Sequence, residues 1–205
     1  MCGKCSFNPI TSRVINTCTV RDKSIQSFQS LYQQAKNNGS AVVIAGCMTA
    51  ADPAMRQRYR NDGIVGVQEI GKIKEVVDSL VLHRQPLQRI QCTSMPPLDL
   101  PKVRKDPSVE ILPISLGCNG ACTFCQTKRA RGNLRSYPLA AILSRIRQVC
   151  KEGVSEVWLT SEDTGAYGSD CGSSFAELLQ GVCECIEGSV RSGCDFKLLF
   201  LYGCE

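Results

Sequence analysis

Short apolar runs alternate along this chain with longer stretches whose apolar residues recur at helical spacing. Residues 13–17 and 41–45 are predicted strands, and residues 22–38 between them place their apolar side chains on one helical face. Parallel strands need a long crossover of this kind, and helices over both faces of the sheet make such strands apolar throughout. The alternation therefore predicts an α/β fold built on parallel sheets.

A proline-rich stretch interrupts the alternation and predicts a domain boundary. Residues 92–107 contain four of the nine prolines and show no sustained apolar periodicity. Proline lacks an N–H donor and restricts the residue before it, so a helix or a sheet strand is disfavoured here. We therefore expect a first domain over residues 1–91, a linker over 92–107 and a second domain over 108–205.

The other elements are predicted by the same spacing. In the first domain it indicates a further strand and helix over 64–67 and 73–81. In the second domain it indicates strands over 109–116 and 156–160, and helices over 138–149 and 175–186.

Cysteine is the unusual component of the composition, with 14 among 205 residues. A secreted disulfide scaffold is one explanation, but the chain shows no signal peptide and its alternation provides a core without disulfides. Reduced, metal-ligating cysteine is the better prediction. No run of 18 apolar residues predicts a membrane segment, and the cytoplasm is the default location. The net charge of +5 is compatible with an RNA partner, and no DNA partner is expected.

Three cysteines at C-x3-C-x2-C spacing form the most informative motif, CNGACTFC. Cys118, Cys122 and Cys125 follow an apolar run and a single glycine. A structural zinc site takes four ligands, and electron-transfer iron–sulfur clusters take four cysteines. Three thiolates therefore predict an iron–sulfur cluster with one iron open to a substrate.

Cys18 and Cys47 each follow a predicted strand of the first domain. The carboxyl ends of neighbouring parallel strands meet at one edge of the sheet, where functional groups collect. If the two strands are neighbours, both thiols face one crevice. The alternative is that each is a small buried apolar residue.

The CNGACTFC motif resembles the cluster motif of radical S-adenosylmethionine (SAM) enzymes. The resemblance implies that Cys118, Cys122 and Cys125 hold a 4Fe–4S cluster whose fourth iron binds SAM. The reduced cluster then cleaves SAM to a 5′-deoxyadenosyl radical, and the protein supplies geometry and the exclusion of water. Phe124 lies where the family often has an aromatic residue near the bound nucleoside.

Neighbouring motifs narrow this resemblance to the methylthiotransferases. INTCTV (15–20) and AGCMTA (45–50) resemble motifs of their N-terminal domain, which holds a second 4Fe–4S cluster. LDLPKVRKDP, KRARGNLRSYP and VWLTSEDTGAYGSD are similar to the eukaryotic and archaeal branch acting on threonylcarbamoyladenosine in tRNA. This branch converts that nucleoside, 3′ of the anticodon, to its 2-methylthio derivative. The implied fold is a parallel α/β domain followed by the first part of a radical SAM (β/α) half-barrel.

The resemblance also implies roles for single residues. Cys18 and Cys47 would hold the second cluster, with Cys2 or Cys5 as the third ligand. Glu162 and Asp163, after the second barrel strand, would position SAM or adenosine, and the alternative is a solvated acidic turn. A basic run beside the cysteine loop would meet tRNA phosphates, with a solvated surface as the alternative: Lys128, Arg129, Arg131 and Arg135.

The resemblance covers about residues 13–187, and we expect a chain truncated at both ends relative to the family. Only twelve residues separate Cys5 from Cys18, too few for a first strand and helix, and the third barrel strand is expected to be missing. One alternative function is therefore a catalytically incomplete iron–sulfur-binding fragment. Another is a methylthiotransferase acting on isopentenyladenosine, against which the LDLPKVRK and SEDTGAYG strings argue.

Overall fold

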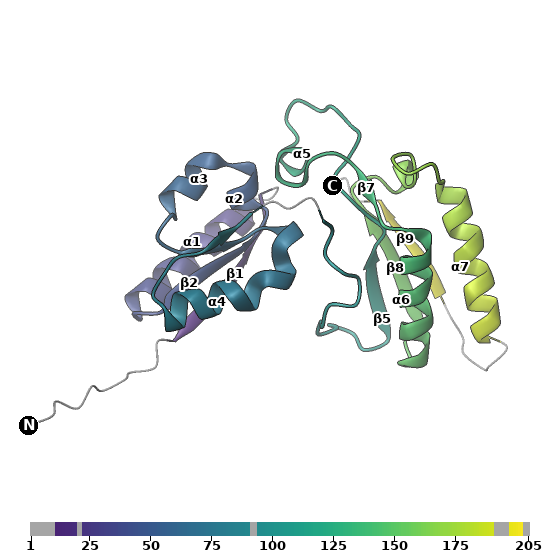
Figure 1. Ribbon diagram of the computed structural model, residues 1–205, viewed down its shortest axis with the longest axis horizontal. Helices are drawn as coiled ribbons and strands as arrows, with labels where there is room; N and C mark the ends of the chain where they lie inside the picture. Colours follow the sequence, from purple (N-terminus) through teal and green to yellow (C-terminus); the bar gives the residue numbers. More distant parts are fainter. Residues whose placement is uncertain (1–10, 20–21, 91–93, 191–196, 203–205) are drawn as a thin grey trace, which may run out of the picture. The chain divides into compact units, whose positions relative to one another are not determined.

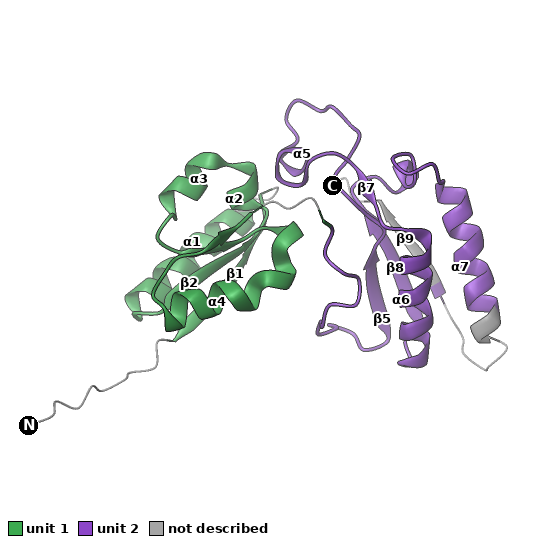
Figure 2. Cartoon of the chain, in the orientation of Figure 1, with its two compact units in different colours: residues 1–94 green, residues 95–205 purple. Residues whose placement is uncertain are grey.

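The structure of the protein is a computed structural model that describes residues 11–19, 22–90, 94–190 and 197–202 (Figure 1). The chain forms two compact units, Met1–Ser94 and Met95–Glu205 (Figure 2). Each unit combines a parallel sheet with helices, which confirms the predicted α/β class.

The first unit is built on a parallel sheet with the strand order β1-β2-β3-β4. These strands are β1 (Ser12–Thr17), β2 (Ala41–Gly46), β3 (Gly63–Val65) and β4 (Gln88–Arg89). The helical segments are α1 (Asp22–Asn37), α2 (Met48–Ala51), α3 (Pro53–Arg58), η1 (Val67–Lys72) and α4 (Ile73–Leu82). The predicted strands and helices of this half are therefore present, with ends shifted by one or two residues.

Helices cover both faces of this sheet. In β2, Val42 and Ile44 pack with Phe28 of α1, whereas Val43 between them packs with Val76 of α4. Successive side chains of a strand point to opposite faces, so the continuous apolar run of β2 fills two cores. Figure 1 shows α1 behind the sheet and α4 in front of it.

The second unit contains a parallel sheet with the strand order β5-β8-β9 and a separate antiparallel ribbon. The sheet strands are β5 (Val109–Pro113), β8 (Glu156–Ser161) and β9 (Lys197–Tyr202), and the ribbon strands are β6 (Ser115–Leu116) and β7 (Arg135–Ser136). The helical segments are α5 (Gln126–Arg131), α6 (Leu139–Lys151), η2 (Thr164–Ala166) and α7 (Phe175–Val190).

Helices α6 and α7 pack on the same face of the β5-β8-β9 sheet. Ile146 of α6 and Leu178 of α7 share one core with Leu112 and Leu159 of the strands. Strands in sequence order with both helices on one face are the repeating arrangement of a (β/α) barrel. The second unit therefore has the architecture of part of a half-barrel.

Two expectations about the strands are corrected. Residues 197–202 form β9, parallel to β8, so the expectation of a missing third strand was wrong. The predicted strand over 109–116 is two strands, because β5 ends at Pro113 and β6 pairs antiparallel with β7. One apolar run can serve two pairings, which its periodicity does not reveal.

The proline-rich stretch forms no helix or strand in its described part, but it packs along the second unit. Met95 and Leu98 contact the core of this unit, and the Tyr137 hydroxyl donates to the Pro96 carbonyl at 2.8 Å. Burial raises the pKa of Tyr137 to about 12, so this hydroxyl keeps its proton. Residues 95–104 are called the strap below.

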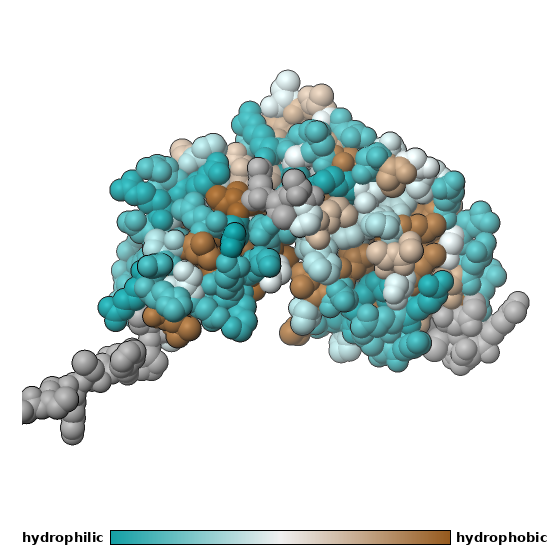
Figure 3. All heavy atoms as spheres, in the orientation of Figure 1, coloured by the Kyte–Doolittle hydropathy of each residue, from teal (hydrophilic) through white to brown (hydrophobic). Residues whose placement is uncertain are grey.

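The surface of each unit is mainly hydrophilic on the face shown in Figure 3, with apolar side chains in smaller patches. Among the residues that the structure describes, no helix is both long and apolar enough to cross a membrane.

Candidate functional site

The cysteine loop leaves and re-enters the second unit through the β6–β7 ribbon. Ser115 lies opposite Ser136 in this ribbon, and Cys118 follows β6 after a single residue, Gly117. Gly117 has a φ of +75°, and a Cβ atom there would lie 2.2 Å from the Asn133 carbonyl oxygen. Only glycine fits this close approach, which brings the start of the loop against the segment that ends it.

Helix α5 holds both ends of the cysteine loop. Cys125 caps the helix, and its sulfur accepts from the Lys128 backbone N–H at 3.3 Å. The Lys128 ammonium donates to the Cys118 carbonyl, and the Cys118 N–H donates to the Gly132 carbonyl at 3.3 Å. The two outer cysteines are therefore fixed by the same short helix and by Gly132, which caps its C-terminal end.

The three thiols of the loop differ in exposure. Cys118 and Cys125 are half-buried, Cys122 is exposed, and none of the three is in a disulfide. The Gly120 N–H donates to the Cys118 sulfur at 3.1 Å, so two of the three sulfurs accept backbone hydrogen bonds. Three cysteines outside disulfides, two of them accepting N–H hydrogen bonds, fit an iron–sulfur cluster, since thiolates hold such clusters and hydrogen bonds to their sulfurs help to set the cluster potential.

The three thiols of the loop are not grouped as a metal site in the part of the chain that the structure describes. Within residues 11–19, 22–90, 94–190 and 197–202, no three Cys, His, Asp or Glu side chains form a group that could hold a metal ion. The ends of the loop are tied down and its middle, with Cys122, is exposed.

The carboxyl end of β8 lies beside this loop. Glu162 forms an ion pair with Arg131 at the end of α5, and the Ser161 hydroxyl lies 2.5 Å from that of Ser115. Asp163 instead caps η2, where its carboxylate accepts from the Ala166 N–H at 3.3 Å. The two acidic residues thus have different surroundings, and only Glu162 is joined to the helix that follows the cysteines.

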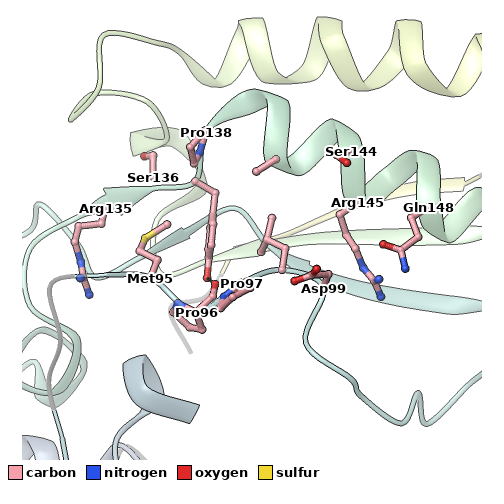
Figure 4. A pocket seen from close by; sticks show the side chains of 13 residues that line it. Met95, Pro96, Pro97, Asp99, Arg135, Ser136, Pro138, Ser144, Arg145 and Gln148 are labelled. Atoms are coloured by element: carbon pink, nitrogen blue, oxygen red, sulfur yellow. Dashed lines mark hydrogen bonds between the residues drawn. The ribbon is translucent and has the colours of Figure 1, made fainter. Parts of the chain in front are cut away.

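The four basic residues near the cysteine loop also have different surroundings. Lys128 contacts Cys118, Arg131 contacts Glu162, and Arg129 is exposed on α5. Arg135 lines a cavity of about 570 Å³ between the strap and α6 (Figure 4). Phe124, predicted near a nucleoside, is 82% exposed.

A buried charge cluster under the strap was not predicted from the sequence. Glu110 in β5 is fully buried and pairs with Lys102 and Arg104 of the strap and with Arg145 of α6. Arg104 and Arg145 also reach Glu152. The sequence did contain a signal for this cluster: Glu110 lies within an apolar strand pattern, and a glutamate is buried in a strand only when cations pair with it.

In the first unit, Cys18 and Cys47 follow neighbouring strands as predicted, because β1 pairs with β2 from Ser12 to Thr17. The Cys47 sulfur accepts from the Thr19 N–H at 3.2 Å, one residue beyond Cys18. Cys47 is buried and Cys18 is half-buried. Cys2 and Cys5, the suggested third ligands, lie outside the described residues.

Comparison with known proteins decides the family. The model of the Radical SAM superfamily matches residues 112–186, which contain the cysteine loop, α6, β8 and part of α7. Threonylcarbamoyladenosine tRNA methylthiotransferases from Danio rerio and Homo sapiens are 43% and 42% identical to this chain over 83% and 86% of its length. The chain belongs to the radical SAM methylthiotransferase family.

An archaeal member of this methylthiotransferase family extends the relationship. The probable threonylcarbamoyladenosine tRNA methylthiotransferase of Pyrococcus horikoshii is 33% identical over 87% of the chain. The chain covers 32% of the Danio rerio and human relatives and 42% of the archaeal one. It therefore spans about a third of the length of the animal relatives.

Proposed function

We propose that this chain supplies the cysteine loop and the first strands of a tRNA methylthiotransferase that acts on threonylcarbamoyladenosine. The reaction would replace the hydrogen on carbon 2 of the adenine by a methylthio group. The observation that carries the proposal is the three-cysteine loop at the carboxyl edge of a parallel sheet, in a chain whose relatives bear that name. No observation favours isopentenyladenosine as the substrate.

Cys118, Cys122 and Cys125 would hold a 4Fe–4S cluster with SAM on its fourth iron. When bound, the cluster supplies the electron that cleaves SAM and gives a radical able to activate an unreactive C–H bond. The chain's own contribution is positional: α5 fixes the outer cysteines, and the backbone N–H groups of Gly120 and Lys128 donate to their two sulfurs.

Glu162 and Asp163 would position SAM or the adenosine from the end of β8. Glu162 supports this role because its pairing with Arg131 keeps the carboxylate beside the cysteine loop. Exposed Arg129 and cavity-lining Arg135 are the proposed tRNA phosphate contacts, since arginine forms bidentate bonds with phosphate. Phe124 would cover the nucleoside. The cytoplasmic location stays a prediction.

Cys18 and Cys47 would contribute to a second 4Fe–4S cluster. Their support is the pairing of β1 with β2 and the contact of the Cys47 sulfur with the loop after Cys18. Cys2 or Cys5 would complete the ligand set.

Iron and sulfide analysis after anaerobic reconstitution tests the ligand assignments. About four irons per chain indicates one cluster, and about eight indicates both. Replacement of Cys122 by alanine should abolish the first cluster, while replacement of Cys171, also exposed but outside the loop, should not. Equal iron content in these two variants would contradict the loop as the ligand set.

Product analysis tests the reaction. With dithionite and SAM, the loaded chain should release 5′-deoxyadenosine, and with threonylcarbamoyladenosine-containing tRNA it should give the 2-methylthio nucleoside. A cluster that forms but yields neither product would leave the iron–sulfur-binding fragment as the function of this chain.

A further inference from the structure

Lys128 contacts both outer cysteines of the loop. Its backbone N–H donates to the Cys125 sulfur at 3.3 Å, and its side-chain ammonium donates to the Cys118 carbonyl. Cys118 and Cys125 are seven residues apart in sequence, and Lys128 links these two ends of the cysteine loop.

The backbone on either side strengthens this closure. The Cys118 N–H donates to the Gly132 carbonyl at 3.3 Å, and the Gly132 N–H donates to the Lys128 carbonyl at 2.9 Å. Cys118 is therefore held on its carbonyl side by the Lys128 side chain and on its amide side by the residue that ends α5. Without the lysine, one of these two attachments is lost.

The neighbouring basic residue is placed differently. Arg129 is exposed, whereas Lys128 is half-buried and directed at the loop backbone. A hydrogen bond from a charged donor is stronger than one from a neutral donor, so the removal of a charged donor costs more free energy. The ammonium is thus used inside the loop rather than offered to a phosphate.

We propose that Lys128 is a positioning residue that presets the separation of the Cys118 and Cys125 thiols before the cofactor binds. This inference rests on the proposed cluster site. It assigns to the lysine a role in cluster retention, separate from the arginines proposed to contact tRNA. Cys122, exposed between the fixed ends, would complete the ligand set.

Hydrogen exchange on the cofactor-free full chain tests the preset loop directly. Lys128→Met keeps the aliphatic length and removes the donor, and Lys151→Met at the exposed end of α6 is the matched control. Exchange of the Cys118 amide should accelerate about tenfold in Lys128→Met, because one of its two neighbouring attachments is gone. It should stay at the wild-type rate in the control.

Chelator challenge of the reconstituted chains tests the consequence for the cluster. Iron should leave Lys128→Met about tenfold faster than the control, and Lys128→Arg, which keeps a cationic donor, should stay within about twofold of wild type. Circular dichroism melting checks that all variants fold, and Lys128→Gln replaces the methionine variant if that one does not.

The outcomes separate this inference from the proposed function. A wild-type chain that binds no cluster contradicts the cluster site, while the exchange experiment still reports on Lys128. A wild-type chain that binds the cluster, with exchange and iron loss in Lys128→Met equal to the control, overturns the positioning role. A change confined to tRNA affinity and its salt dependence overturns it as well, because it would place the lysine on phosphate.

Discussion

Glu110 is a fully buried carboxylate whose neighbours are cations. Lys102, Arg104 and Arg145 lie within 3.0 Å of its oxygens, at side-chain exposures of 35%, 20% and 7%. A buried charge is tolerated only where partners satisfy it, so the residue depends on the strap and on α6 together. Two of the three cations, Lys102 and Arg104, belong to the strap, so their ion pairs with Glu110 attach the strap to the sheet.

Glu110→Gln should destabilise the second unit by about 3 kcal/mol, because it leaves buried cations without their carboxylate. Glu152→Gln is the control: its side chain is 34% exposed, and solvent screening makes the loss of such an ion pair much less costly. Urea unfolding measures both. Equal losses in the two variants would contradict the central role of Glu110.

The same residue should make the fold acid-labile. Burial alone would raise the pKa of Glu110, but the ion pairs with Lys102, Arg104 and Arg145 lower it below the ordinary value of 4.5. The unfolded chain then binds more protons, so the carboxylate stabilises the fold at pH values above its unfolded pKa, and this contribution is lost as the pH falls through the lower, folded value.

Unfolding free energy measured from about pH 5 to about pH 3 should therefore fall more steeply for wild type than for Glu110→Gln. Parallel profiles for the two proteins would assign the acid lability to other carboxylates.

At the scale of elements, the other end of the strap is held by the Tyr137 hydroxyl as well as by the packing of Met95 and Leu98. Tyr137→Phe removes the bond to the Pro96 carbonyl and should cost about 1 kcal/mol. Chymotrypsin should then cleave after Leu98, which packs on the core in the wild type, several times faster.

Tyr167→Phe provides the matched comparison. Its hydroxyl donates to the Tyr137 carbonyl at 2.9 Å and does not touch the strap. Its loss should cost a similar free energy of unfolding without faster cleavage after Leu98. Faster cleavage in both variants would mean that general loosening, rather than release of the strap, exposes this bond.

Sequence patterns predicted the long helices and missed several of the shorter elements. The helices α1, α4, α6 and α7 show apolar periodicity over ten or more residues, so their cores could be inferred. The ribbon of β6 and β7 has two residues per strand and exists only through long-range pairing. Strand β9 was missed because the expectation followed family motifs rather than its own apolar run.

The candidate site was predictable to the same extent. Cysteine spacing is local, so Cys118, Cys122 and Cys125 could be identified as a set. The partners that position the loop are not adjacent in this way: the Arg131–Glu162 pair joins residues 31 positions apart. The bond from the Lys128 ammonium to the Cys118 carbonyl lies within one loop, but it could not be predicted because the sequence does not reveal how that loop closes.

At the scale of the whole molecule, the apolar cores are separate. The clusters around Phe28 and Val76 contain only residues of the first unit, and the cluster around Ile146 contains only residues of the second. Since each unit has its own core residues, calorimetry should resolve two transitions, one for each unit.

Phe28→Ala should lower one transition and leave the other in place, because the loss of a buried phenylalanine costs about 3–5 kcal/mol within its own core. Ile146→Ala should lower the second transition instead. A single transition that moves with either substitution would contradict independent units.

The β6–β7 ribbon has a consequence for how this part of the molecule can vary. Leu116 and Arg135 lie opposite each other in the ribbon, so the residues between them form a loop whose two ends are joined by strand pairing. This loop lies outside the parallel β5-β8-β9 sheet. A loop whose ends are already paired can change in length at a small cost in closure entropy. Redesign of the residues between the cysteines should therefore be possible without altering the path from β5 to α6.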